Sequence, residues 1–161
     1  MTLEQRMEQL KAMRPKIDGK IASAAQNATL RAMEKAAELT PPTAKDLRGT
    51  NTRTGEMKQH WSSDSKPKPV KNGSNYTTIL ANNMQYASYV NDGHRMDRHF
   101  VPGLYINPDS GMLEFMPGAK VGIVVGTKTA YVPGLFMVEA AQEEYRRVVK
   151  TELAGLEAMF K

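Results

Sequence analysis

The sequence predicts a single α+β domain: an antiparallel sheet packed by a long N-terminal helix and a C-terminal helix, with an inserted β-hairpin arm. Apolar residues recur at helical spacing at both ends, and the middle is rich in β-branched and aromatic residues interrupted by turn residues. The length of 161 residues suits one domain spanning 1–161. With 24% charged and 40% hydrophobic residues, a folded domain is favoured over a disordered chain.

The N-terminal helix is predicted over residues 2–39. Thr2, followed three residues later by Gln5, is typical of a capping box. Pro15 either opens a second helix or kinks one long helix. Two prolines after Thr40 are expected to end it. One face carries small and apolar residues every three or four positions, namely Ile17, Ile21, Ala24, Ala28, Ala32, Ala36 and Leu39.

A strand-rich core is predicted over residues 53–95. Its strands are expected at 55–63, around the single tryptophan, and at 75–82, because both have β-type composition. The stretch SKPKPVKNG, residues 65–73, is expected to be the connector between them. The chain then enters an inserted hairpin and loop region, 96–133.

Within that inserted region, residues 104–115 predict a hairpin. Two β-rich runs are separated there by Pro-Asp-Ser-Gly, a sequence typical of turns. A short apolar strand is predicted at 121–127, where Gly122 indicates a bulge or a close backbone approach.

The C-terminal helix is predicted over residues 134–161. Its charged residues lie off an apolar stripe, which needs a partner surface, most simply a sheet. The stripe consists of Val138, Ala141, Tyr145, Val149, Leu153, Leu156 and Phe160.

Two histidines and two aspartates fall within residues 89–100, a composition that raises the question of a metal site. Asp92, His94, Asp97 and His99 do not have the spacing of a helical ligand pair, and the neighbouring arginines would oppose a cation. We therefore expect no metal here. Asn91-Asp92-Gly93 instead predicts a tight turn with positive φ angles, which makes the segment a structural corner.

The sequence gives no signal of catalysis or of a cofactor. It contains no phosphate-binding glycine loop and no dinucleotide fingerprint, and Ser62, Ser63 and Ser110 lie in no nucleophile elbow. The absence of cysteine excludes disulfides and thiolate sites and suits a reducing cytosol. No apolar run approaches the roughly 18–20 residues of a membrane span, and the N-terminus has no signal-peptide apolar region.

The formal net charge of +5 is concentrated in the N-terminal half, most densely at 65–71. A basic nucleic-acid-binding module in the 53–71 segment is therefore the alternative function, with Trp61 as a stacking platform. The simpler interpretation is a solvated loop and a core tryptophan. The cations of this possible DNA-facing loop are Arg53, Lys58, Lys66, Lys68 and Lys71.

The segment NNMQYASYVNDGHRM, residues 82–96, resembles the "YA.YVE.G.R" signature of the small tail-completion, or head–tail joining (neck), proteins of long-tailed bacteriophages. A second stretch resembles that family's "P…TG.L..S" pattern at Pro42, Thr54, Gly55, Met57 and Ser62. A proline-glycine corner then precedes the C-terminal helix, as in the family. The first signature is matched by Tyr86, Ala87, Tyr89, Val90, Gly93 and Arg95.

The resemblance implies a structural virion protein of the phage neck or tail top, assembled in the host cytoplasm. Such proteins form a homo-oligomeric ring, typically a hexamer, that joins the head-side connector or stopper to the tail tube. DNA passes through the lumen as cargo, without catalysis, a cofactor or a membrane. The longer gap before Thr54 and the inserted region 96–133 depart from the family pattern.

The predicted hairpin is the candidate interface with other copies or partners. If exposed, its apolar residues would form the kind of patch that marks an interface; otherwise it folds back on its own core. Arg95 could pair with a carboxylate of its own chain or of a neighbour. The candidate apolar residues are Leu104, Tyr105, Ile106, Met112, Leu113, Phe115 and Met116.

Overall fold

The computed structural model describes residues 2–43, 55–126 and 130–156, and it confirms the α+β class. The helices are α1 (Leu3–Leu39), α2 (Glu56–Ser63), α3 (Ala87–Asp92) and α4 (Met137–Leu153). The strands are β1 (Lys66–Asn72), β2 (Asn75–Ile79), β3 (Gly93–Arg95), β4 (His99–Pro102), β5 (Leu104–Ile106), β6 (Leu113–Phe115), β7 (Gly122–Val125) and β8 (Tyr131–Pro133).

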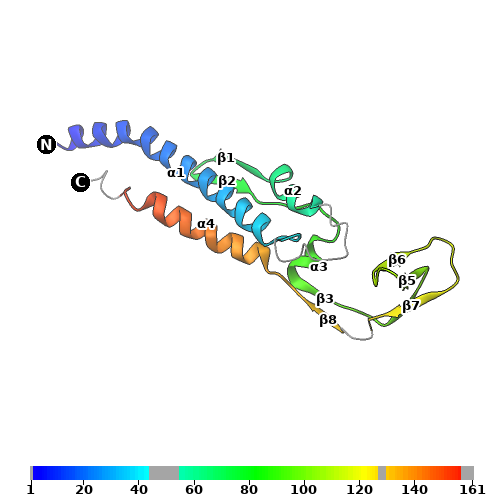
Figure 1. Ribbon diagram of the computed structural model, residues 1–161. Helices are drawn as coiled ribbons and strands as arrows, with labels where there is room; N and C mark the ends of the chain where they lie inside the picture. The colour runs from blue at the N-terminus through cyan, green and yellow to red at the C-terminus, as the bar shows by residue number, and fades with distance from the viewer. Residues whose placement is uncertain (1, 44–54, 127–129, 157–161) are drawn as a thin grey trace.

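Figure 1 shows two parts of the molecule joined by a narrow connection. We call α1, α2, α3, α4 and the β1–β2 hairpin the body. The connection, which we call the stalk, is the β3–β8 pair, and the arm beyond it carries β4, β5, β6 and β7. The arm lies at the opposite end of the molecule from the start of α1 and the end of α4 (Figure 1).

Helix α1 begins as predicted and runs without interruption through Pro15. The Thr2 hydroxyl accepts from the Gln5 backbone N–H at 3.3 Å, and the Thr2 N–H donates to Gln5 Oε1 at 2.9 Å. These two bonds confirm the capping box. The helix ends before Thr40, whose hydroxyl donates to the Ala36 carbonyl at 2.7 Å.

Helix α4 runs antiparallel to α1 and packs along its second half (Figure 1). The expectation that a sheet covers the α4 stripe is therefore wrong. The facing residues of α1 are small: Ala28 and Ala36 are fully buried, as is Ala141 of α4. Because alanine side chains keep the helix axes close, α4 can bury its stripe against α1 itself. Phe160, predicted to extend the stripe, lies outside the described residues.

The strand predicted at 55–63 is wrong, because residues 56–63 form α2. Met57 and Trp61 lie one turn apart on its buried face, each 4% exposed. The Trp61 indole Nε1 donates to the Thr40 hydroxyl at 2.7 Å. Burial of this pair against α1 and α4 outweighs the β propensity of tryptophan. The core cluster consists of Ala32, Ala36, Met57, Trp61, Met137 and Ala141.

The described strands form four separate two-stranded antiparallel sheets rather than one sheet. The predicted connector 65–73 is wrong, because residues 66–72 form β1 and pair with β2. The hairpin predicted at 104–115 is confirmed as β5–β6. The strand predicted at 121–127 is confirmed over residues 122–125, which form β7 and pair with β4, while residue 127 lies outside the described residues. A Cβ at Gly122 would lie 2.1 Å from the Val101 carbonyl oxygen, so the close-approach interpretation of Gly122 is confirmed.

The stalk joins two segments that are distant in the sequence. Gly93, His94 and Arg95 pair with Pro133, Val132 and Tyr131, and the Met96 N–H donates to the Ala130 carbonyl at 3.0 Å. The predicted inserted region, 96–133, thus overlaps the stalk. Its last three residues belong to the stalk, and the arm both leaves and returns through the same narrow ladder.

Candidate functional site

The signature segment forms a corner between α3 and the stalk, but its turn chemistry differs from the prediction. Asn91 and Asp92 end α3, and among these three residues only Gly93 has a positive φ, +80°. A Cβ at Gly93 would lie 2.6 Å from the Gly134 nitrogen, the Val132 carbonyl oxygen and the Tyr131 hydroxyl. Glycine is therefore required both by the backbone angle and by the space where the stalk crosses the start of α4.

Asn91 holds this corner together, and the sequence interpretation missed it. The side chain is 8% exposed, and its Oδ1 accepts from the Val138 N–H at 3.0 Å. Its backbone carbonyl accepts from the Phe136 N–H, also at 3.0 Å. Phe136 is the N-cap residue of α4, yet its side chain makes no capping bond. Asn91 thus caps α4 from a distant position. Asparagine is a favoured cap residue, but sequence spacing cannot reveal a cap that comes from another element.

The remaining signature residues divide between core and surface. Ala87 and Val90 pack against the core cluster, whereas Tyr86 and Tyr89 are 44% and 59% exposed. Arg95 is exposed, and no hydrogen bond or ion pair joins its side chain to another described residue. The segment therefore anchors the stalk to the body while presenting two aromatic rings and one guanidinium group to solvent.

The two histidines of the segment do not converge. His94 lies in the stalk, with Nδ1 3.4 Å from the Tyr89 carbonyl oxygen and its ring edge-on to the Tyr89 ring. His99 lies in β4, with Nδ1 2.7 Å from the Asp97 carbonyl oxygen. Among the described residues, no three His, Asp or Glu side chains are arranged to hold a metal ion.

The β5–β6 hairpin has one apolar and one polar face. Ile106 lies opposite Leu113 and Leu104 opposite Phe115, and this face, which we call the arm face, consists of these four side chains. Ile106, Leu113 and Phe115 are 60%, 52% and 62% exposed, and Leu104 is half-buried. Such a set of exposed large apolar side chains is unusual for a monomer and typical of an interface.

The opposite face of the hairpin is polar. The Tyr105 hydroxyl and Asn107 Nδ2 each donate to a carboxylate oxygen of Glu114 at 2.7 Å. The bond from Tyr105 lowers the pKa of Glu114, and the same bond raises the pKa of Tyr105. Tyr105, predicted to belong to the apolar patch, is thus turned away from the arm face, while the flanking Met112 and Met116 are exposed.

The arm face is not covered by the body. Figure 1 shows β5 and β6 beyond the stalk, away from the helices, so the hairpin does not fold back on the core. Other exposed apolar residues lie nearby on the arm strands and the link between them, namely Phe100, Val121 and Val124.

The predicted basic loop is not a single loop. Arg53 and Thr54 lie outside the described residues, Lys58 lies on α2, and the other three cations lie on β1. Lys66 and Lys68 are exposed.

The third lysine of β1 is held by the body. Lys71 Nζ lies 2.5 Å from Asp18 Oδ2 and 5.4 Å from the centre of the Tyr76 ring. The hydrogen bond between Lys71 and Asp18 lowers the pKa of Asp18 and raises the pKa of Lys71. Trp61, at 4% exposed, cannot stack on a nucleic-acid base.

No helix within the described residues combines the length and the apolar character that crossing a membrane requires.

The fold is thus an α+β body that closes its own core and projects a hairpin with an exposed apolar face. Residues 2–93 match the model of the family described as "Bacteriophage HK97-gp10, putative tail-component". This match covers more than half of the chain, so the chain belongs to this family of phage structural tail components, which are not enzymes. The resemblance to tail-completion proteins is thereby confirmed. No curated protein and no solved structure matches the chain.

Proposed function

We propose that the chain is a subunit of a homo-oligomeric ring, a hexamer by analogy with tail-completion proteins, at the neck or tail top of the virion. The ring joins the head-side connector or stopper to the tail tube and lets DNA pass through its lumen. The subunits are made in the host cytoplasm and assemble there. Family membership supports the setting, since the family consists of tail components.

The observation that carries the proposal is the arm face. Burying apolar surface contributes about 25 cal/mol per Å². Covering three large side chains that are more than half exposed would therefore stabilise a complex. A second copy or an adjoining virion protein can cover this face. Exposed Arg95, at the base of the arm, is available for a carboxylate of the same neighbour.

The alternative, a nucleic-acid-binding module in residues 53–71, has only the exposed Lys66 and Lys68 in its favour. Its stacking platform is missing, because Trp61 lies on the buried face of α2. DNA in a channel must also slide, so strong binding there would oppose function. A nucleic-acid-binding module predicts salt-sensitive DNA binding by the monomer, whereas a ring subunit predicts little.

The test compares the full chain with a variant in which residues 104–116 are replaced by a two-glycine link. Native mass spectrometry of each protein, alone and with the tail-tube protein of the same phage, measures assembly. We expect rings from the full chain and a folded monomer from the truncated chain, with equal helix content by circular dichroism. Val70→Lys, which places a charge at an exposed apolar position of the body, is the control and should keep its rings. Rings from the truncated chain would refute the role of the arm.

A further inference from the structure

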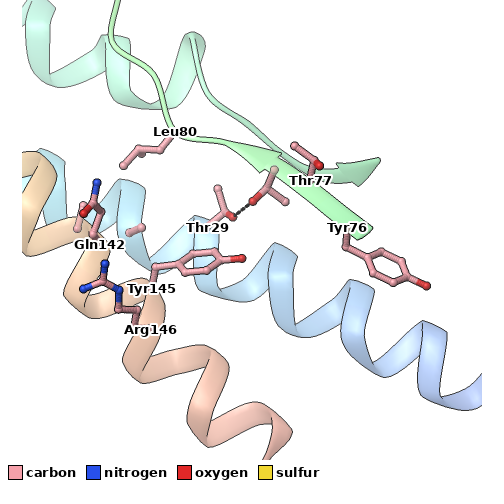
Figure 2. Close-up of a pocket in the computed structure, with 10 residues that line it drawn as sticks. Thr29, Tyr76, Thr77, Leu80, Gln142, Tyr145 and Arg146 are labelled. Carbon is pink, nitrogen blue, oxygen red and sulfur yellow. Dashed lines mark hydrogen bonds between the residues drawn. The ribbon is translucent and has the colours of Figure 1, made fainter. Parts of the chain in front are cut away.

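The body contains a groove that no described element of the chain fills. It measures about 450 Å³ and lies between β2 and α4, over α1. Figure 2 shows Tyr145 reaching across it from α4 toward Thr29 of α1, with Thr77 of β2 on the far side. The Thr29 and Thr78 hydroxyls are hydrogen-bonded at 2.7 Å and fix β2 to the groove floor. The groove is therefore bordered by a strand on one side and a helix on the other.

The two outer edges of the β1–β2 hairpin differ in chemistry. β1 has the sequence KPKPVKN, and prolines with lysines are the residues that protect a strand edge from pairing with another chain. β2 has the sequence NYTTI, with neither proline nor lysine. It pairs with β1 alone, and no backbone hydrogen bond joins its other edge to another described element. The edge that borders the groove is thus the open one.

The arm hairpin offers a strand that matches this edge. β6 pairs only with β5, so its second edge is also open within the described residues. Leu113 and Phe115 lie on one face of β6, and Glu114 lies on the other. If β6 aligned with β2, its apolar pair would continue the half-buried face formed by Tyr76 and Thr78.

The arm hairpin and the groove carry opposite charges. Residues 104–116 contain Asp109 and Glu114 and no lysine or arginine. Among the described residues that line the groove, Arg146 alone is charged, and no hydrogen bond or ion pair joins its side chain to another described residue. An acidic hairpin is therefore attracted to a groove that holds this cation.

We propose that β6 of one copy adds to the open edge of β2 in a second copy, with its arm face in the groove over α1. The inference rests on the proposed self-assembly and names the acceptor of the arm. The hairpin of the same chain cannot reach the groove, because it lies beyond the stalk (Figure 1). Donor and acceptor are different surfaces, so the contact is heterologous and repeats from copy to copy, which closes into a ring when the rotation permits.

The test uses two variants that are each defective in one surface. The arm variant carries Leu113→Lys and Phe115→Lys, and the groove variant carries Gln142→Glu and Arg146→Glu; all four side chains are exposed. Alone, each should lose assembly in native mass spectrometry. Mixed, they should form a 1:1 heterodimer and nothing larger, because one intact hairpin meets one intact groove. Damage to the hairpin of the arm variant does not affect this outcome, since that chain supplies only its groove.

The matched control is Lys66→Glu with Lys68→Glu, which changes charge on the protected edge of the same hairpin and should leave assembly unchanged. If the wild-type chain forms rings but the mixed variants stay monomeric, the arm has another acceptor and this inference is wrong, while the proposed ring stands. The inference is also wrong if the groove variant alone forms rings. A wild-type chain that stays monomeric with and without its tail-tube partner overturns the proposed function as well.

Discussion

Trp61 of the body and Phe115 of the arm lie in opposite environments. Trp61 in the body is 4% exposed and donates a hydrogen bond to Thr40, whereas Phe115 in the arm is 62% exposed. The body buries a core cluster within one chain, along the α1–α4 contact and around α2. The arm pairs its backbone but leaves its apolar face open. This contrast predicts that changes in the body affect folding, whereas, under the proposed function, changes in the arm affect assembly.

The largest expected effect separates these two aromatic residues directly. Trp61→Ala should lower the free energy of unfolding by about 3–5 kcal/mol, because it leaves a cavity in the core. Phe115→Ala, at an exposed position, should change it by less than about 0.5 kcal/mol. Urea denaturation measures both. Equal losses would mean that the arm contributes to the core of the monomer and that the contrast is mistaken.

Gly93→Val tests the junction between the two parts. The valine Cβ would meet backbone atoms at 2.6 Å, and the residue would need a φ of +80°. We therefore expect the free energy of unfolding, measured by urea denaturation, to fall by about 3 kcal/mol. Gly73→Val is the matched control, because Gly73 has a φ of +60° and nothing within 4 Å of the added Cβ. Gly73→Val should lower the free energy of unfolding by about 1 kcal/mol, which is the cost of the positive φ without crowding. Similar losses for both variants would remove crowding from the explanation.

Asn91→Ala tests the cap that the corner supplies to α4. The Val138 N–H loses its acceptor at a helix start, which should cost about 1–2 kcal/mol. Hydrogen exchange should accelerate at the Val138 amide. Asn91→Asp keeps an acceptor but places a second carboxylate beside Asp92. Its free energy of unfolding should therefore lie between those of Asn91→Ala and the wild type. Unchanged exchange in the alanine variant would show that water replaces the cap.

The smallest effect concerns pH and is confined to the arm. The pKa of Glu114 is lowered in the folded hairpin by the Tyr105 hydroxyl. The Glu114 carboxylate therefore contributes fully to the stability of the hairpin above the ordinary glutamate pKa of about 4.3. This contribution is lost as the pH falls through the lowered pKa of the folded state. Hydrogen exchange at the Tyr105 amide should accelerate there, while the body stays protected. Glu114→Gln keeps an acceptor and should show no such pH dependence.

Features with a local cause could be predicted from the sequence. The capping box of Thr2 and Gln5, the ends of α1, the amphipathic pattern of α4 and the turn within 104–115 each depend on neighbouring residues. The apolar arm followed from the same patterns. Alternation along β5 places Tyr105 on the polar face, but hairpin register was needed to show which face it shares with Glu114.

Features that depend on contacts between residues distant in the sequence could not be predicted from it. The composition around Trp61 favours a strand, yet burial against α1 and α4 makes α2 a helix. The division of the strands into separate pairs depends on where the stalk folds back, and the role of Asn91 depends on Val138 lying beside it. The open edge of β2 is visible only once β1 has been assigned to its other side.

The stalk has an evolutionary consequence. Because Arg95 and Tyr131 lie opposite each other, the intervening segment can be lengthened, shortened or exchanged as a cassette without displacing α1 or α4. The family match ends at residue 93, at the base of this cassette. If the arm docks as proposed, exchange of the gene segment between codons 95 and 131 would change its docking specificity while the folding unit is inherited unaltered.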